Sequence, residues 1–289
     1  MKVNGGYLIA DADGVLTPHP TGLVECSNDE YHSGPGISKS HLDKINGASP
    51  MHYWHHYLNP DREPEAPTPA KVLGSAIHSI ILEPDLFSLE FAINPGIDRR
   101  SNAGKAEHAQ FVAENAGKTI ITDDQAQACY AIRDAVHRHP LANGLLQRGK
   151  AEQSFYAIDK ETGELIKCRI DYLPDSGNMI VDVKSTEDAS PGAFGKSAAN
   201  YRYPLQTAWY QDVLDACFGE HPEHWVFLAF EKEPPYAIGV YFADATDVQR
   251  ARIAGRRDLL RIVEHKRSGM WPDFGQEVLP LQLPTWWKP

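Results

Sequence analysis

The spacing of apolar and polar residues divides the chain into two halves. In the first half, apolar residues recur at helical intervals, and Ser, Thr or Pro stands where several of these segments begin. After Gly149, the spacing changes to the period of two that is typical of strands. The predicted order is helices, a strand meander, a helix, two strands and a long helix. This order favours an α/β (α+β) fold with a helical N-terminal half.

The same periods, together with the residues that cap helices and form turns, set the bounds of each element. Helices are expected from near His41 and over residues 51–58, 70–82, 103–116 (with Gly117 as C-cap), 122–139, 203–218 and 247–268. Strands are expected over residues 152–159, 165–172, 179–184, 225–231 and 236–242. Residues 1–30 carry few periodic signals, so we expect a loosely packed or extended N-terminal segment. The Pro-rich residues 60–69 predict a loop, and the tail with Trp286 and Trp287 is expected to be irregular.

The composition excludes several classes of protein. There are 28 Lys and Arg against 39 Asp and Glu, which gives a formal net charge of −11. A protein that coats DNA needs a basic excess, whereas a nuclease needs carboxylates at its metal site and can keep its positive charge local. The four cysteines are widely separated, which excludes zinc-ribbon and iron–sulfur spacing and favours a reduced, cytoplasmic location. No apolar stretch approaches about 20 residues, so no membrane span is expected.

Two predicted neighbouring strands carry the most informative polar residues. Asp182 and Lys184 are two apart, so their side chains share one face of a strand. The turn at residues 174–177 folds the two strands antiparallel and brings Asp171 towards Asp182. Carboxylates suit Mg²⁺, and a nearby lysine can orient or deprotonate a metal-bound water. This arrangement is typical of phosphodiester hydrolysis, although a short D-x-K motif alone is more often a surface salt bridge.

Two predicted helices add polar residues at a spacing of four, which places each pair on one helical face. Gly74 and His78 form one pair, and Gln206 and Tyr210 form the other. By itself, a histidine in an apolar helix is more often a satisfied core residue than a ligand. By itself, the Gln206–Tyr210 pair is ordinary packing with a polar tip.

Together these motifs resemble a known family. Gly74-x-x-x-His78, Arg169-x-Asp171, Asp182-x-Lys184 and Gln206-x-x-x-Tyr210 follow one another in the order found in PD-(D/E)XK nucleases of the RecB-type group. The lead-in of residues 31–40 and the segment 181–189 resemble the RecE-type (exonuclease VIII) nuclease domains of phages and prophages. Ile170 stands where the proline of the "PD" motif would be, which is usual in this group. The resemblance implies a restriction-endonuclease-like core, a central mixed β-sheet flanked by helices, within one domain of residues 31–289, with its catalytic core at about 70–245.

The same resemblance implies roles for individual residues. His78, Asp171, Asp182 and the backbone carbonyl of Val183 would bind a divalent metal, and Lys184 would act on the attacking water. Gln206 and Tyr210 would orient the site and touch the DNA backbone, and Glu152 resembles an acidic residue often found near such sites. Ser38 and Ser40 would hold a 5′-phosphate, although a helix N-cap is at least as good an interpretation. The remaining residues expected at the DNA are Arg169, Ser185 and Thr186.

The resemblance also implies an activity and its setting. The expected activity is a Mg²⁺-dependent exonuclease, with Mn²⁺ able to substitute and no iron–sulfur cluster. It would degrade linear double-stranded DNA from the 5′ end and leave a 3′ single strand. A ring-like homo-oligomer, a single-strand-annealing recombination protein as partner and a phage or prophage origin would accompany it. Two alternatives stay open: a structure-specific or nicking endonuclease on the same core, and a DNA-binding or assembly module without catalysis. The Arg-rich helix over residues 247–268 could line a DNA channel or be a solvated face.

Overall fold

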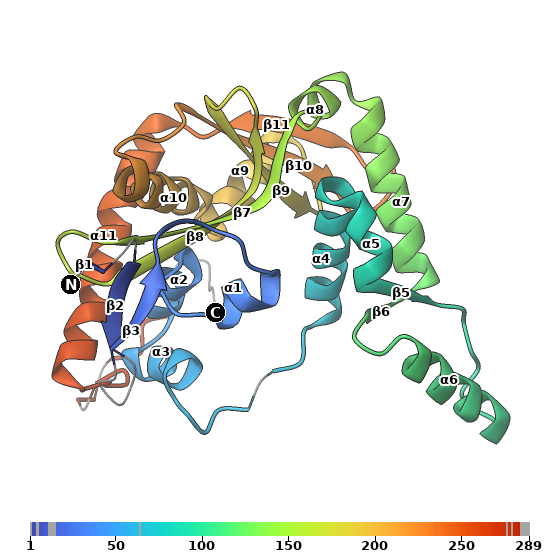
Figure 1. Cartoon of the computed structure of the whole chain (residues 1–289), viewed down its shortest axis with the longest axis horizontal. Coiled ribbons are helices and arrows are strands. Elements are labelled where there is room, and N and C mark those ends of the chain that lie inside the picture. Colours follow the sequence, from blue (N-terminus) through green and yellow to red (C-terminus); the bar gives the residue numbers. More distant parts are fainter. Residues whose placement is uncertain are drawn as a thin grey trace.

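A mixed β-sheet with helices on both faces forms the centre of the molecule (Figure 1). The computed structural model describes residues 2–3, 6–10, 16–63, 65–275, 277–278 and 280–283, so Trp286 and Trp287 lie outside the described residues. Within these ranges, six strands form the central sheet in the order β11-β10-β9-β8-β7-β4. Their bounds are β4 (Gly22–Val24), β7 (Gly149–Ile158), β8 (Leu165–Pro174), β9 (Met179–Thr186), β10 (His224–Glu231) and β11 (Ile238–Phe242).

The chain order of the strands explains which pairs are antiparallel. Short turns join β7 to β8 and β8 to β9, and Gly163 and Gly177 adopt positive φ angles of 76° and 71° in them. Such turns favour glycine because it has no Cβ, and they fold consecutive strands antiparallel. β9 pairs with β10 in parallel, because α9 (Pro191–Asn200) and α10 (Tyr203–Phe218) connect them.

Each face of the sheet has its own apolar core. One face packs against α2 (Lys39–Gly47), α3 (Pro50–Tyr57), α9, α10 and α11 (Ala245–Ser268). The other packs against α4 (Pro69–Leu82), α5 (Pro84–Glu90), α7 (Asp123–Arg138) and α8 (Pro140–Leu145). In β9, Ile180 joins the first core, whereas Val181 and Val183 join the second. This alternation sends Asp182 to the α10 side of the sheet, and the predicted period of two in this strand is confirmed.

Smaller elements lie around this centre. β5 (Phe91–Asn94) and β6 (Thr119–Thr122) form a two-stranded parallel sheet, and α6 (Asn102–Glu114) extends away from the body (Figure 1). α1 (Asn28–Ser33) precedes α2. In the N-terminal segment, β1 (Lys2–Val3), β2 (Gly6–Ala10) and β3 (Leu16–Pro20) form an antiparallel sheet. β4 pairs with β7, so residues 22–24 extend the central sheet.

Most predicted elements are confirmed, and α10 has the predicted bounds. The prediction of Gly117 as a C-cap is wrong, because α6 ends at Glu114 and is capped by Asn115. α9 was not predicted, since it has a single large apolar residue, Phe194, and two glycines, and the short elements α1, α5, α8, β5 and β6 were also missed. These elements are too short to show a clear period, and tertiary contacts decide their conformation.

Several positive charges of the Arg-rich helix α11 are matched by acids on other elements. Arg252 donates to Asp212 of α10, and Arg256 donates to Asp159 beside the β7–β8 turn. Asp258 of α11 accepts a hydrogen bond from Arg202, which precedes α10. These ion pairs attach α11 to the core, which favours a packing role over a DNA channel.

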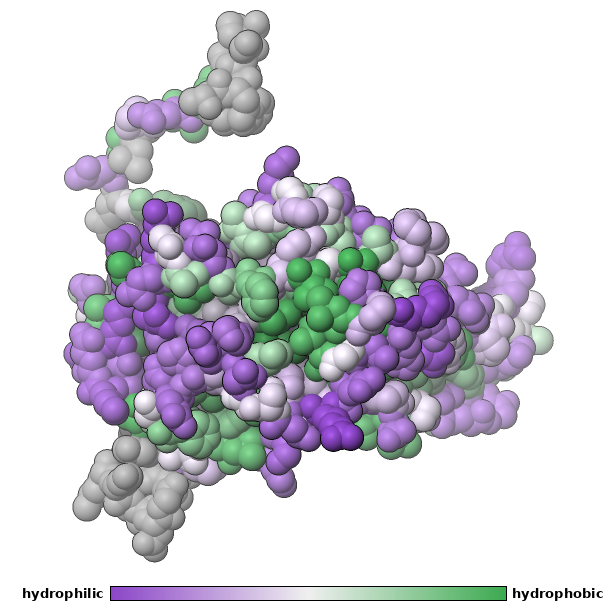
Figure 2. Space-filling model, turned by 90° about the horizontal axis from the view of Figure 1, so that it is seen from above, coloured by the Kyte–Doolittle hydropathy of each residue, from purple (hydrophilic) through white to green (hydrophobic). Residues whose placement is uncertain are grey.

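Polar residues dominate much of the surface. On the face shown in Figure 2, apolar residues gather near the middle and hydrophilic residues surround them. Within the described residues, every helix is too short or too polar to cross a membrane.

Candidate active site

Two carboxylates face each other across the β7–β8 hairpin. The pairs Ala151↔Tyr172 and Gln153↔Ile170 flank them and place Glu152 opposite Asp171. Glu152 has a φ of 51°, a left-handed conformation that is uncommon for any residue except glycine. Such local strain persists only where surrounding contacts enforce it, and it clusters at functional sites.

Asp171 also separates β8 from β9. The one registered pair between these strands is Tyr172↔Val181, and the Val183 N–H donates to Asp171 Oδ2 at 2.8 Å. A side-chain carboxylate thus accepts a hydrogen bond that a backbone carbonyl would accept in a regular sheet. The strands part at this point, and the carboxylate is held in the opening.

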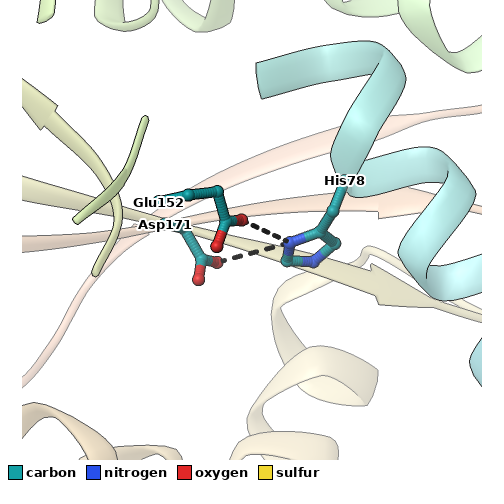
Figure 3. Close-up of side chains that lie close together, drawn as sticks. All are labelled: His78, Glu152 and Asp171. Carbon is teal, nitrogen blue, oxygen red and sulfur yellow. Dashed lines mark ion pairs between the residues drawn. The ribbon is translucent and has the colours of Figure 1, made fainter. Parts of the chain in front are cut away.

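His78 reaches the same two carboxylates from the other layer. It lies on α4, and its Nδ1 is 3.9 Å from both Glu152 Oε1 and Asp171 Oδ2 (Figure 3). One potential ligand atom from each residue lies within 4.8 Å of the others. Burial lowers the pKa of His78, but the charges of Asp171 and Glu152 outweigh it and leave the pKa raised. These three side chains form the His78–Glu152–Asp171 cluster.

Arg169 holds Glu152 in this cluster. Its Nε donates to Glu152 Oε2 at 2.6 Å, and its Nη1 donates to Ser154 Oγ at 2.6 Å and to the Cys26 carbonyl at 3.1 Å. Burial raises the pKa of Glu152, but His78 and Arg169 together leave it lowered. The predicted DNA contact of Arg169 therefore competes with three internal hydrogen bonds.

Asp182 occupies the most buried position of the site. Its side chain is 1% exposed; Gln206 Nε2 donates to Oδ1 at 2.5 Å, and Lys184 forms an ion pair with Oδ2. Oδ2 accepts no directed hydrogen bond. Burial raises the pKa of Asp182 to about 7, aided by the nearby Asp171 and opposed by Lys184. Burial lowers the pKa of Lys184, but the two aspartates leave it raised.

These donors fit a divalent cation. The cluster offers one imidazole nitrogen and two carboxylates, and Asp182 adds a buried carboxylate that is paired with Lys184. Carboxylate oxygens suit Mg²⁺ and Mn²⁺, and an imidazole is compatible with Mn²⁺. Glu152, expected near the site, lies within the cluster, whereas Asp182 pairs with Lys184 and Gln206. The backbone N–H of Val183 donates a hydrogen bond to Asp171. The side chain of Val183 packs in the core on the face that α4 covers.

Tyr210 lies one helical turn after Gln206. Its ring packs edge-on against Trp225, with centroids 5.4 Å apart. Burial raises the pKa of Tyr210 well above its usual value, and Tyr31 and Asp171 add to the shift. A neutral phenol here can donate a hydrogen bond to an anion without introducing another negative charge.

The residues expected at the 5′-phosphate lie on other segments. Ser38 precedes α2, and its Oγ is 2.9 Å from His41 Nδ1, so it belongs to the local cap. Ser40 lies exposed in the first turn of the same helix. At the end of β9, Ser185 is half-buried, and Thr186 donates to the Asp188 carbonyl at 3.1 Å.

Two features of the site escaped the sequence analysis. One is the use of Arg169 to position Glu152. The other is Tyr203, whose ring lies 5.2 Å from Lys184 Nζ. Tyr203 is three residues before Gln206 and therefore lies on the same face of α10. This spacing could have identified Tyr203 from the sequence. A separate cavity of about 520 Å³, between α9, β11 and α11, contains none of the predicted site residues.

The fold is that of a PD-(D/E)XK nuclease. Strands β7, β8 and β9 form an antiparallel meander, β10 pairs with β9 in parallel, and β8 and β9 carry the acids and the lysine. The chain belongs to a family described as PDDEXK-like domain of unknown function (DUF3799), whose model matches residues 38–278. The predicted fold class and the RecE-type resemblance are thereby confirmed.

The chain is similar to solved structures to different degrees. A candidate exonuclease from Eubacterium rectale has a TM-score of 0.62 at 16% identity, over 90% of this chain and 97% of that chain. A phage-related exonuclease from Haemophilus somnus 129PT has a TM-score of 0.33 at 12% identity, over 68% of this chain and 95% of that chain. No curated protein matches the chain.

Proposed function

We propose that the protein is a Mg²⁺-dependent exodeoxyribonuclease that degrades linear double-stranded DNA from the 5′ end and leaves a 3′ single strand. The observation that carries this proposal is the convergence of the His78–Glu152–Asp171 cluster with Asp182 and Lys184 where β8 and β9 part. The family membership and the description of structural relatives as exonucleases support it.

The chain's own residues would divide the work. His78, Glu152, Asp171 and Asp182 would hold the cation, which when bound acts as a Lewis acid on the phosphate and lowers the pKa of a water. Lys184 would orient the attacking water and offset negative charge that develops on the phosphate. Gln206 fixes Asp182, and Arg169 fixes Glu152, so the carboxylates are positioned before DNA binds. Tyr210 and the end of β9, with Ser185 and Thr186, would contact the backbone.

The biological setting is part of the same proposal. Residues 31–289 would act as one catalytic domain in the bacterial cytoplasm, encoded by a phage or prophage. A ring-like homo-oligomer would keep an acidic chain on DNA, because enclosure replaces bulk positive charge. A single-strand-annealing protein would bind the 3′ strand and use it for recombination.

The decisive experiment compares two DNA forms. A linear duplex with one labelled, 5′-phosphorylated end and a closed circular plasmid are incubated with the protein in Mg²⁺, in Mn²⁺ and in EDTA. Degradation of the linear DNA alone, and only with metal, supports the exonuclease, and the label gives the polarity. Cutting of the circle as well identifies an endonuclease. Intact DNA that is nevertheless shifted on a gel identifies the non-catalytic binding module.

Metal binding should stabilise the protein, and less so at low pH. At about 100 times its Kd, the cation should raise Tm by about 5–10 °C at pH 8. The rise should shrink at pH 6, because Asp182, with a pKa of about 7, and His78, with a raised pKa, then hold protons that the cation must displace. Thermal unfolding with Mn²⁺ at both pH values measures this change in Tm. A rise that is equal at both pH values contradicts the assignment.

Two variants serve as the test and the control for this prediction. Glu152→Gln should reduce the rise in Tm. Glu187→Gln, which removes an exposed carboxylate, should not.

The serines before and within α2 distinguish phosphate binding from capping. If Ser38 and Ser40 hold a 5′-phosphate, Ser38→Ala and Ser40→Ala should each reduce the preference for 5′-phosphorylated over 5′-hydroxyl ends by about tenfold. Cleavage rates on the two ends measure this. If the variants keep the preference and only Ser38→Ala lowers Tm, then Ser38 is a helix cap alone.

A further inference from the structure

Tyr201 presents an exposed aromatic ring beside the site. It lies between α9 and α10, and 63% of its surface is exposed. A single exposed apolar residue is ordinary and indicates nothing by itself. Tyr201 differs because its ring stacks on Tyr203, with centroids 5.9 Å apart and an interplanar angle of 19°. Since the buried Tyr203 ring lies 5.2 Å from Lys184 Nζ, two stacked rings lead from the surface to the active-site lysine.

The backbone around Tyr201 is fixed on both sides. Its N–H donates to the Ser197 carbonyl at 2.9 Å, and its carbonyl accepts a hydrogen bond from Lys39 Nζ at 2.7 Å. The next residue, Arg202, donates to Asp258 Oδ2 at 2.6 Å. A flat ring on a fixed backbone can bind a planar ligand with little loss of conformational entropy.

The depth of the site explains why such a ring would be needed. The side chains of Asp182, Asp171 and Lys184 are 1%, 13% and 15% exposed. A flexible single strand reaches acids at this depth more readily than a rigid duplex does, so opening of the terminal base pairs would help to bring a phosphodiester to Lys184. Bases that lose their stacking partners regain stacking on aromatic side chains, whatever their identity.

We propose that Tyr201 is a stacking platform for an unpaired nucleobase at the DNA end, and that it thereby promotes opening of the duplex. The inference rests on the proposed nuclease function and adds a substrate-binding residue to it. Its ligand is any nucleobase of the strand that enters or leaves the site. The Tyr201 ring packs on the buried Tyr203 ring, which in turn contacts Lys184.

Two substrates separate duplex opening from hydrolysis. One is a blunt, 5′-phosphorylated duplex, and the other is the same duplex with its last few base pairs mismatched, so that the end is already open. Tyr201→Ala should slow degradation of the blunt duplex by about tenfold and leave the open end near the wild-type rate. Tyr201→Trp should restore the blunt-end rate, because it keeps a flat ring. Phe218→Ala, which removes a ring 58% exposed at the other end of α10, should change neither rate.

A binding measurement tests the inference without turnover. In an Asp182→Asn background, 2-aminopurine in the open, mismatched end should lose fluorescence on binding, because it stacks on Tyr201, and added Tyr201→Ala should abolish that loss. Equal slowing of both substrates by Tyr201→Ala, or no slowing of either, overturns the platform. If wild type cleaves neither substrate, the proposed function fails, while the fluorescence of the bound end still decides whether Tyr201 stacks on a base.

Discussion

Asp182→Ala should abolish DNA cleavage, with a loss of about 10³-fold or more in turnover. Asp182 is the most buried acid of the site, held by Gln206 and paired with Lys184, so no water or neighbour can replace its carboxylate. Asp171 would be a poorer first target, because it also accepts the Val183 N–H and its removal would disturb the junction of β8 and β9. Single-turnover cleavage of an end-labelled duplex measures the effect.

The controls for Asp182 separate chemistry from folding. Circular dichroism and DNA gel shifts should be close to wild type for Asp182→Ala and for the isosteric Asp182→Asn. Glu187→Gln removes an exposed carboxylate in the loop after β9 and should cleave normally. Undiminished turnover in Asp182→Ala would remove this site from consideration.

Lys184→Ala should lower turnover by about 10²–10³-fold and leave Mn²⁺ binding in place. Asp182 and Asp171 raise the pKa of Lys184, so it is an ammonium in the metal-free protein. We therefore expect its charge to contribute most, and Lys184→Arg should recover part of the activity. If arginine is as poor as alanine, proton transfer by the lysine is the main contribution, since a guanidinium does not give up its proton.

The measurement combines single-turnover cleavage with calorimetric titration of Mn²⁺. Lys196→Ala, an exposed lysine on α9, serves as the matched control and should behave as wild type. A Lys184→Ala protein that cleaves poorly because it no longer binds Mn²⁺ would show that the lysine has a structural role.

Local periodicity was enough to predict much of the fold and the candidate site. The period of two in β9 placed Asp182 and Lys184 on one face, and the spacing of four in α10 placed Gln206 and Tyr210 on one face of that helix. The features of the site that the sequence did not predict depend on contacts between residues far apart in the chain. Arg169 has the sequence pattern of a DNA contact, yet Glu152, Ser154 and Cys26 accept its hydrogen bonds. No local pattern shows where a side chain finds a partner from another strand.

The two faces of the sheet have a consequence for the timing of activity. His78 is supplied by a helix on one face and Gln206 by a helix on the other, while the acids lie on the strands between them. Gln206 is also the last of these residues in chain order. A chain with only one face of the sheet packed therefore lacks part of the site. In the proposed nuclease, activity would thus appear late in folding, after the helices on both faces have packed.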